Sequence, residues 1–464
     1  MIAPSLHPET VRAACERRGR WSFGLTPRTI ALLMAGFVWL IPGFWDGRLA
    51  YAMLAWDGMA LLAALLDGLR LPGAAELVAS REWLNAPALD SKTEIELTVE
   101  NRGRTIIECR LMDDLPPALA AQPGTHRLTV FPRVPATVRY GVEPQERGDW
   151  KAGWLYVRYR SPLGLIERWA RAPLTQTVRV YPALRTGEEQ QIFLARSRQV
   201  DLQLRQARQR GLGRDFESLR EYREGDDLRD ICWTATARHG SPISRQYQSE
   251  RSQAVWIVLD CGRLMRSRVG GAEGGRSHSK LDHACTTAVA LAQLALFSGD
   301  RVGLLAYGKG IQQRLLPGRG AAHMRQLIEL LAQARAESGE ADHLLATAML
   351  NRMQPRRSLI LWVTDLAESA MRPEVIEGAM LLARRHVLLF VAMAQPEINR
   401  IAEGRPRNVD EMFLAAAAQE MAGRRELLLA RLQEQGALTL DLNPEALTAS
   451  VLNRYLAVKE RAMV

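Results

Sequence analysis

Two aspartates in the C-terminal half of the chain follow apolar runs that are typical of buried strands. Asp260 ends the run that begins at Val255, and Asp365 ends the run that begins at Ser358. The carboxyl ends of parallel strands meet at one edge of a sheet, where ligands bind. We therefore expect the two side chains to lie near one another. Because magnesium requires near-octahedral oxygen ligation, two carboxylates alone predict at most a weak magnesium site and favour the absence of a cofactor.

A charged segment directly before the first of these runs combines arginines, carboxylates and aromatics. It spans Gly213–Arg251. Guanidinium groups can hold carboxylates bidentately, so this composition predicts a paired network rather than a solvated linker. A contact between domains is the first interpretation, in which case replacing Asp227 or Trp233 by alanine destabilises the fold; a partner-binding surface is the alternative. The residues assigned to this inter-domain or interaction motif are Arg220, Tyr222, Gly225, Asp226, Asp227, Arg229, Trp233 and Arg238.

The other reactive residue types favour a protein without catalytic residues. The five cysteines show no CxxC pair and no metal-ligand spacing, which predicts reduced, packed thiols rather than a disulfide framework. His239 lies seven residues after Cys232, a separation that does not predict a nucleophile–base pair. The loop Gly270–Gly275 lacks the Gly-Lys-Ser/Thr sequence of a phosphate loop. We therefore expect the chain not to be an enzyme.

The charge of the chain does not favour a nucleic-acid partner. Lys and Arg number 61 against 51 Asp and Glu, for a net charge of +10. A phosphate-binding surface for nucleic acid needs clustered, uncompensated basic residues. Because the basic residues are dispersed among acidic ones, no nucleic-acid partner is predicted.

The elements that must position Asp260 and Asp365 alternate between strands and helices. This alternation predicts a doubly wound, mostly parallel α/β sheet. The expected strands are 255–260, 301–307, 358–365, 387–392 and 437–442, and the expected helices are 281–297, 324–334, 374–384, 410–435 and 445–459.

A region of short alternating runs precedes the charged segment. Turn residues separate these runs, a pattern typical of an antiparallel β-sandwich that serves as a scaffold or docking module. The expected strands are 94–99, 106–111, 127–131, 138–142, 154–159 and 178–181.

Two apolar runs near the N-terminus predict a membrane hairpin. Thr29–Trp45 contains no charged residue, and Leu49–Leu66 contains one, Asp57. At about 1.5 Å per residue, each run approaches the roughly 30 Å of a hydrocarbon core. Arginines flank the hairpin, which places both termini in the cytoplasm. Asp57 is interpreted as a helix-pairing contact or, in the favoured alternative, as part of a helix that sits shallow or begins later.

The expected organisation is a multidomain α+β chain in the cytoplasmic membrane with two transmembrane helices. It consists of a cytoplasmic N-terminal tail (1–27), a transmembrane hairpin (28–70), a β-sandwich domain (76–184), a charged linker with the motif (185–251) and an α/β domain (252–464).

This order of parts resembles a bacterial family named domain of unknown function 58. The resemblance rests on Arg160–Leu165, Val180–Pro182, the motif from Gly213 to Trp233 with Arg238 and Glu250, and Tyr455–Lys459. Members of that family join a membrane hairpin, a β domain and a von Willebrand factor type A domain, so the resemblance implies the last fold for residues 252–464.

In a type A domain, an Asp-x-Ser-x-Ser sequence, a threonine and a further aspartate hold magnesium. Here Gly262 and Leu264 replace the two serines, and Ala341 stands where the threonine is expected. Only Asp260 and Asp365 remain of that site, so the resemblance implies the fold without its full metal chemistry.

The resemblance also implies a partner, because such proteins are commonly linked with MoxR-type AAA+ ATPases; transglutaminase-like membrane proteins are another frequent companion. The expected function is therefore that of a membrane-anchored, non-catalytic protein-interaction adaptor that works with a MoxR-type ATPase in the assembly or activation of protein complexes. The alternatives are a metal-dependent enzyme that uses Asp260 and Asp365, and a purely structural envelope scaffold that contacts other membrane proteins.

Overall fold

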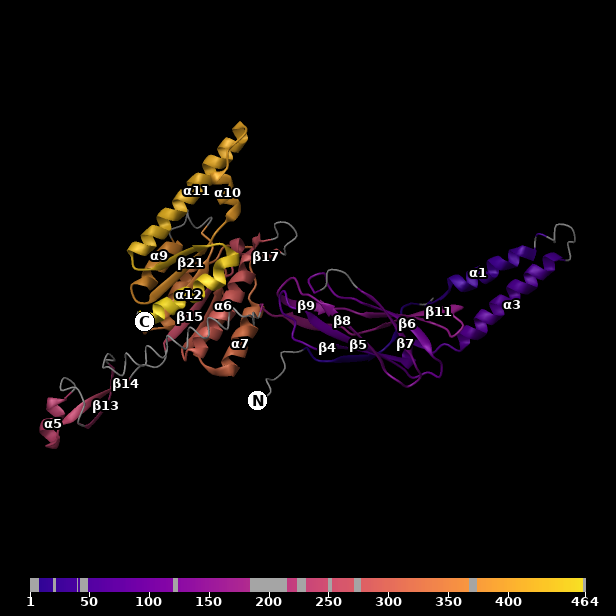
Figure 1. Cartoon of the computed structure of the whole chain (residues 1–464), viewed down its shortest axis with the longest axis horizontal. Helices are drawn as coiled ribbons and strands as arrows, with labels where there is room; N and C mark the ends of the chain where they lie inside the picture. The colour runs from indigo at the N-terminus through magenta and orange to yellow at the C-terminus, as the bar shows by residue number, and fades with distance from the viewer. Residues whose placement is uncertain are drawn as a thin grey trace. The chain divides into compact units, whose positions relative to one another are not determined.

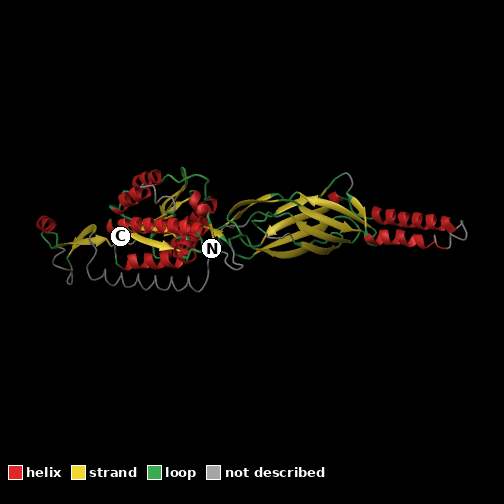
Figure 2. Cartoon of the chain, turned by 90° about the horizontal axis from the view of Figure 1, so that it is seen from above, coloured by secondary structure: helices red, strands yellow, loops and turns green. Residues whose placement is uncertain are grey.

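The structure, a computed structural model, describes residues 8–19, 22–39, 41, 49–119, 124–183, 215–222, 231–248, 253–270, 277–366 and 374–461. The chain divides into two compact units, Met1–Ala183 and Leu184–Val464. Helices and sheets occur in both units (Figure 2). The predicted mixed α+β class is therefore confirmed.

Two larger antiparallel sheets and a two-stranded one form the β part of the first unit (Figure 1). Its strands are β1 Val11–Ala14, β2 Glu16–Arg17, β3 Phe23–Leu25, β4 Leu77–Trp83, β5 Thr93–Asn101, β6 Ile107–Asp113, β7 Thr125–Val130, β8 Ala136–Val142, β9 Gly148–Ala152, β10 Leu155–Arg160, β11 Ile166–Ala172 and β12 Gln176–Val180. β9 pairs with β12 in the two-stranded sheet. Of the two larger sheets, the first has the order β1-β4-β5-β8, and the second has the order β2-β11-β10-β6-β7 with β3 also paired to β11. One apolar core, with Leu97 from the first sheet and Val157 from the second, lies between them.

Val11–Ala14, Glu16–Arg17 and Phe23–Leu25 are strands of this β domain, so the expectation of a separate tail over 1–27 is wrong for these residues. Val11 pairs with Arg81 in an antiparallel ladder, and Cys15 is buried in the shared core. The sequence conceals these strands because each is short and alternates arginines or glutamates with small residues. Such a pattern has too little apolar surface to indicate a strand before the partner strand is known.

A buried ion pair crosses the interior of the β domain. Arg81 of β4 is fully buried, and its Nε donates to Asp113 Oδ2 of β6 at 3.0 Å. The guanidinium group also donates to the carbonyl of Leu174 at 2.8 Å. Tyr140 of β8 donates its hydroxyl to the same carboxylate at 2.5 Å. The two sheets are thus joined by a carboxylate whose charge is matched within the core.

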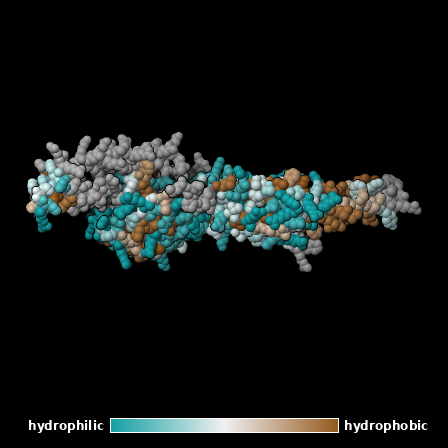
Figure 3. All heavy atoms as spheres, turned by 90° about the horizontal axis from the view of Figure 1, so that it is seen from below, coloured by the Kyte–Doolittle hydropathy of each residue, from teal (hydrophilic) through white to brown (hydrophobic). Residues whose placement is uncertain are grey.

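Two apolar helices pack against one another at the end of the first unit. They are α1 Pro27–Gly36, extended by the 3-10 turn η1 Phe37–Trp39, and α3 Leu49–Leu69. Among the described residues, one helical segment, Tyr51–Leu69, is long and apolar enough to cross a membrane. Apolar side chains cover this helix pair (Figure 3). Residues 42–48, which would complete the predicted hairpin, lie outside the described residues.

Asp57 lies where α3 meets α1. A Cβ atom at Gly36 would come within 2.5 Å of Asp57 Oδ1, so the glycine makes room for the carboxylate. The neighbouring Trp56 donates its indole N–H to the carbonyl of Leu32 at 2.8 Å. α3 begins at Leu49, and the segment of it that could cross a membrane is Tyr51–Leu69. Asp57 thus packs against α1, although its Oδ1 accepts no hydrogen bond from the described residues there.

The loop between β10 and β11 holds both helices to the β domain. Asp67, near the end of α3, is buried and accepts hydrogen bonds from the Ser161 hydroxyl and from the backbone N–H of Leu165 at 3.2 Å. Thr26, the N-cap of α1, donates its hydroxyl to the carbonyl of Gly164 at 2.5 Å. Gly164 has a φ of 70°, a left-handed conformation that glycine adopts without strain.

The second unit is built on a six-stranded sheet in the order β19-β18-β15-β20-β21-β22 (Figure 1). These strands are β15 Ala254–Asp260, β18 Arg301–Tyr307, β19 Ile311–Gly318, β20 Leu359–Thr364, β21 Val387–Met393 and β22 Leu438–Leu442, and Arg268–Val269 (β16) pairs with His278–Ser279 (β17) apart from the sheet. The helices are α6 Lys280–Phe297, α7 Gly320–Gln333, α8 His343–Met353, α9 Glu374–Ala383, α10 Pro396–Glu403, α11 Val409–Glu434 and α12 Leu447–Glu460.

Helices cover both faces of this sheet, as predicted for a doubly wound fold. Trp256 and Val258 pack with residues of α8, α9 and α11, whereas α6 contacts β15 and β18 together with α12. The ladders are parallel except for β19, which pairs with β18 as an antiparallel edge strand. This strand was not predicted because its Gln312-Gln313-Arg314 stretch is polar.

Replacing Arg81 by methionine is expected to lower the free energy of unfolding of the β domain by about 3–5 kcal/mol, because Asp113 would stay buried without its cation. Urea unfolding of the full-length protein in detergent, followed by tryptophan fluorescence, measures the change. The control is Arg139→Met, since Arg139 pairs with Glu96 on the exposed side of the first sheet and should shift the midpoint little. Equal midpoints for the two variants would contradict the role of the buried pair.

Candidate functional site

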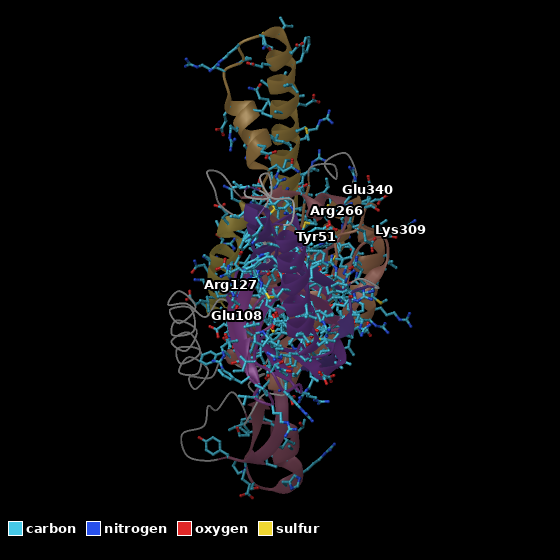
Figure 4. The ribbon with its side chains drawn as sticks, turned by 90° about the vertical axis from the view of Figure 1, so that its right-hand side faces the viewer. Tyr51, Glu108, Arg127, Arg266, Lys309 and Glu340 are labelled. Atoms are coloured by element: carbon cyan, nitrogen blue, oxygen red, sulfur yellow. The ribbon has the colours of Figure 1, made fainter. Side chains whose placement is uncertain are left out.

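Asp260 and Asp365 lie at the edge of the sheet where the sequence predicts them. β15 and β20 are parallel neighbours, with Leu259 opposite Val363. The order of strands reverses between these two, and ligands of open α/β sheets bind at such a switch point. The exposed charged residues Arg266, Lys309 and Glu340 are labelled in Figure 4 and belong to loops around this edge.

The carboxylate of Asp260 is buried, and hydrogen bonds from its own surroundings satisfy both oxygens. The backbone N–H of Gly262 donates to Oδ1 at 2.7 Å, and the Thr364 hydroxyl donates to Oδ2 at 2.7 Å. Burial raises the pKa of Asp260 to about 6, although these two hydrogen bonds act in the opposite direction. Asp260 is therefore held by the loop and strand around it.

The carboxylate of Asp365 is also buried, and a lysine ammonium group neutralises it. Lys280 Nζ lies 2.5 Å from Asp365 Oδ2, and the two side chains are 2% and 0% exposed. Gln395 donates to both carboxylate oxygens at 3.2 and 3.3 Å, and Arg425 Nη1 lies 3.8 Å away. Lys280 is the first residue of α6, whose N-cap Ser279 and Asp282 form a capping box. The helix start therefore brings a cation to the sheet edge.

These residues do not fit magnesium. An ammonium and a guanidinium group lie beside Asp365, so a divalent cation would meet like charge there. A Cβ atom at Gly262 would lie 3.0 Å from the backbone N of Ala341, so the position of the missing serine is closed by backbone. In the described part of the chain, no group of three or more His, Cys, Asp or Glu side chains could hold a metal ion.

A buried polar chain that sequence reasoning missed lies beside Asp260. Trp362 donates its indole N–H to the Tyr307 hydroxyl at 2.8 Å, and this hydroxyl lies 2.9 Å from His343 Nδ1. Because the indole can only donate, the Tyr307 hydroxyl accepts from Trp362 and shares a further hydrogen bond with His343 Nδ1. All three residues are buried. No pattern in the sequence joins them, because they come from two strands and one helix.

A second missed group holds the C-terminal helix. Tyr455 donates its hydroxyl to Asp300 Oδ2 at 2.6 Å, and Lys459 Nζ lies 3.3 Å from the same oxygen. Both side chains belong to α12 and are buried. Tyr455–Lys459 is one of the segments that carry the family resemblance, and in the structure it packs α12 against the start of β18.

The charged motif contains regular structure, so the description of 185–251 as a linker is incomplete. β13 Asp215–Glu221 and β14 Ile243–Gln248 form an antiparallel pair with the short helix α5 Trp233–His239 between them. Cys232 is buried, as expected for a packed thiol; the four other cysteines are also buried, and none of the five forms a disulfide. Burial raises the pKa of Cys15 and of Cys109 to about 12, which disfavours a thiolate nucleophile at either position.

The tryptophan of this motif is on the surface. Trp233 is 70% exposed, so the prediction that its loss leaves a cavity is wrong. Tyr222 is half-buried and Arg238 is exposed on α5. The backbone of Arg220 lies in β13, whereas Gly225, Asp226, Asp227 and Arg229 lie outside the described residues. An exposed tryptophan agrees better with a partner surface than with a buried domain contact.

Comparison with known families finds a match over the motif and most of the sheet. The family model described as protein of unknown function DUF58 matches residues 218–410. The resemblance to domain of unknown function 58 is confirmed over these residues. They include Trp233, Asp260, Lys280 and Asp365.

Two curated relatives of the chain are described as uncharacterized proteins. The uncharacterized proteins Mb1516 of Mycobacterium bovis and Rv1480 of Mycobacterium tuberculosis are each 27% identical to the chain over 190 residues. The match covers 40% of this chain and 56% of each relative, so the chain matches little more than half the length of these proteins.

Similar solved structures are distant. The conserved hypothetical protein BatB from Bacteroides thetaiotaomicron has a TM-score of 0.27 at 16% identity and covers 44% of this chain and 99% of its own. An uncharacterized membrane spanning protein from Vibrio fischeri has a TM-score of 0.18 at 16% identity, with 44% and 96% covered. These scores are too low to establish a shared fold.

Replacing Lys280 by methionine is expected to lower the free energy of unfolding by about 3–5 kcal/mol, because Asp365 would remain buried without its closest cation. The double variant Lys280→Met/Asp365→Asn removes both charges and should recover part of this loss. Urea unfolding of the full-length protein in detergent compares the two. Equal destabilisation of the single and double variants would show that the ion pair is not what the site requires.

The stability of the second unit should depend on pH through Asp260. Because burial raises its folded pKa from 3.8 to about 6, the folded state binds this proton more tightly than the unfolded state. The stability gained is present below pH 3.8 and is lost as the pH rises through about 6. Two pKa units correspond to about 3 kcal/mol.

The Asp260→Asn variant isolates this effect, since asparagine carries no titrating proton. The unfolding free energy of the wild-type protein should fall more steeply than that of Asp260→Asn between pH 3.8 and about 6. Urea unfolding of both proteins across this range measures the difference. Parallel pH profiles would contradict a raised pKa at Asp260.

Proposed function

We propose that this chain is a membrane-anchored, non-catalytic protein-interaction adaptor that works with a MoxR-type AAA+ ATPase in the assembly or activation of protein complexes. The proposal rests on one observation: groups of the chain itself bind both carboxylates at the sheet edge. Asp365 is paired with Lys280, and Asp260 is bound by Gly262 and Thr364. With these oxygens occupied by donors of the chain itself, the switch point is suited to a structural role and not to metal-assisted catalysis.

The membrane anchor of this proposal is the pair α1 and α3. The 21 residues of α3 extend about 31 Å at 1.5 Å per residue, close to the roughly 30 Å of a hydrocarbon core. α1 and η1 are apolar and pack on α3 through Trp56. In the proposal, α1 and η1 belong to one membrane crossing and α3 forms the other. Both termini then face the cytoplasm, because arginines flank the helix pair.

The adaptor role of the second unit rests on its resemblance to a von Willebrand factor type A domain. The strand order, with one antiparallel edge strand and aspartates after β15 and β20, supports that assignment. The match of residues 218–410 to DUF58 supports a partner from the ATPases linked with such proteins. Trp233 supplies an exposed aromatic anchor of the kind that contributes strongly to protein interfaces.

Affinity purification of the tagged full-length protein from its own membranes in mild detergent, followed by mass spectrometry, tests the partner. We expect a AAA+ ATPase in the wild-type sample and its loss in Trp233→Ala, without a change in melting temperature because the side chain is exposed. The control is Phe413→Ala on α11, an aromatic residue that is 73% exposed and should retain the ATPase.

Three results would contradict the proposal or part of it. Lower melting of Trp233→Ala with the ATPase retained would make the tryptophan a structural contact. Equal loss in both variants would show that the effect is not specific to the motif. Recovery of envelope proteins without any AAA+ ATPase would favour the scaffold alternative instead.

A further inference from the structure

Four arginines gather on the outer face of the second sheet of the β domain. In the antiparallel ladders, Arg158 of β10 lies opposite Arg110 of β6, which lies opposite Arg127 of β7. In the next row, Arg160 lies opposite Glu108. Directly opposite side chains have Cβ atoms about 4.5–5.5 Å apart, and like charges in such pairs are destabilising. A row of three arginines therefore needs counter-charge close by.

The two carboxylates beside these four arginines neutralise only part of their charge. Glu167 of β11 forms ion pairs with Arg158 and Arg160, and Glu108 stands in the second row. Four guanidinium groups against two carboxylates leave two positive charges in excess. The charges of Arg127 and then Arg160 lower the pKa of Arg110 below its ordinary value.

These side chains line a pocket of about 280 Å³ whose polar walls are Glu108, Arg110, Arg127, Thr129, Arg158 and Arg160. Small-ligand sites have volumes from roughly 300 Å³ upward, so this pocket is close to the smallest of them. Glu108 and Arg127 are labelled together on this face in Figure 4. Guanidinium groups bind phosphate oxygens through paired, charge-assisted hydrogen bonds. The pocket therefore has the size and chemistry for one phosphate group with a small substituent.

The pocket begins at the end of the β domain that joins the apolar helices. Arg160 directly precedes Ser161, whose hydroxyl donates to Asp67 of α3. Thr105, close to the start of β6, donates its hydroxyl to the carbonyl of Arg70 at 2.9 Å. At about 3.3 Å per strand residue, Arg158 lies only roughly 7 Å farther from this junction. Both rows of arginines are therefore within headgroup depth of a membrane that α3 crosses.

Exposed apolar side chains surround the same end of the domain. They come from the loops and strand ends next to the helix pair, and they are Phe23, Leu25, Ile106, Phe131 and Leu163. Each is more than two-fifths exposed, with Phe23 at 51%, Leu163 at 57% and the lowest, Leu25, at 43%. Apolar residues flanked by arginines are typical of protein surfaces at the membrane interface. This arrangement favours lipid over a soluble anion as the source of the phosphate.

We propose that the arginine pocket of β6, β7 and β10 binds the phosphate of an anionic phospholipid headgroup in the leaflet next to the β domain. The proposal rests on the membrane anchoring proposed above. Binding of lipid phosphate by these arginines would fix how deeply the β domain sits at the membrane. Anionic lipids attract basic residues close to the surface, with roughly a fivefold gain in affinity for each arginine.

The test measures the melting temperature of the full-length protein in mild detergent as phosphatidylglycerol or phosphatidylcholine is added. A ligand of the native state raises the melting temperature by mass action, so phosphatidylglycerol should raise it and phosphatidylcholine should not. Arg110→Gln/Arg127→Gln should weaken the phosphatidylglycerol response about twentyfold or more, given about fivefold per arginine. Without lipid this variant should melt no lower than the wild-type protein, because two like charges are removed.

The matched control is Arg139→Gln, which removes one charge from the first sheet and should keep the response. Equal responses to the two lipids, or an equal loss in Arg139→Gln, would overturn the proposal. A response to inorganic phosphate as large as that to phosphatidylglycerol would overturn the lipid assignment in favour of a free phosphate ligand.

Carbonate washing of membranes from expressing cells separates this proposal from the function on which it rests. A chain that leaves the membrane would contradict the anchor and with it the adaptor proposal. A chain that stays in the membrane but does not distinguish the two lipids would contradict the pocket alone.

Discussion

The ion pair of Lys280 with Asp365 is the interaction on which the character of the second unit depends. A carboxylate that is 0% exposed must be protonated, bound to a cation or surrounded by donors, since an isolated buried charge is prohibitively unfavourable. In this chain the first turn of α6 supplies the cation. A side chain that belongs to the fold is always present, so the sheet edge needs no dissolved ion to be stable.

The same constraint determines the other junctions of the protein. Asp113 joins the two β-sheets through Arg81 and Tyr140, and Asp67 joins α3 to the loop that precedes β11. Each carboxylate lies where elements distant in the sequence meet. A buried ion pair or charged hydrogen bond tolerates little displacement of its partners. These aspartates therefore specify how the elements dock more than they add to net stability.

The β domain combines this internal neutralisation with a face where charge is not neutralised. The interior pair of Arg81 with Asp113 is complete, whereas the row of Arg110, Arg127 and Arg158 on the outer face has an excess of positive charge. Within one domain, the paired charge in the interior stabilises the fold, whereas the excess charge on the outer face is suited to binding an anion. It also places the candidate anion site on rigid strands, next to the point where the apolar helices attach, so that membrane anchoring and anion binding would reinforce one another.

Sequence patterns by themselves determined the class of each region. The strands around Asp260 and Asp365 and the apolar length of α3 follow from local periodicity, because burial repeats every second residue in strands and every three to four in helices. What only the tertiary structure decided was the state of the charged groups. Lys280 stands 85 positions from Asp365, and such a pairing leaves no periodic trace in the sequence. The exposure of Trp233 and the row of arginines likewise arise from strand register and docking, which bring together residues that the chain keeps far apart.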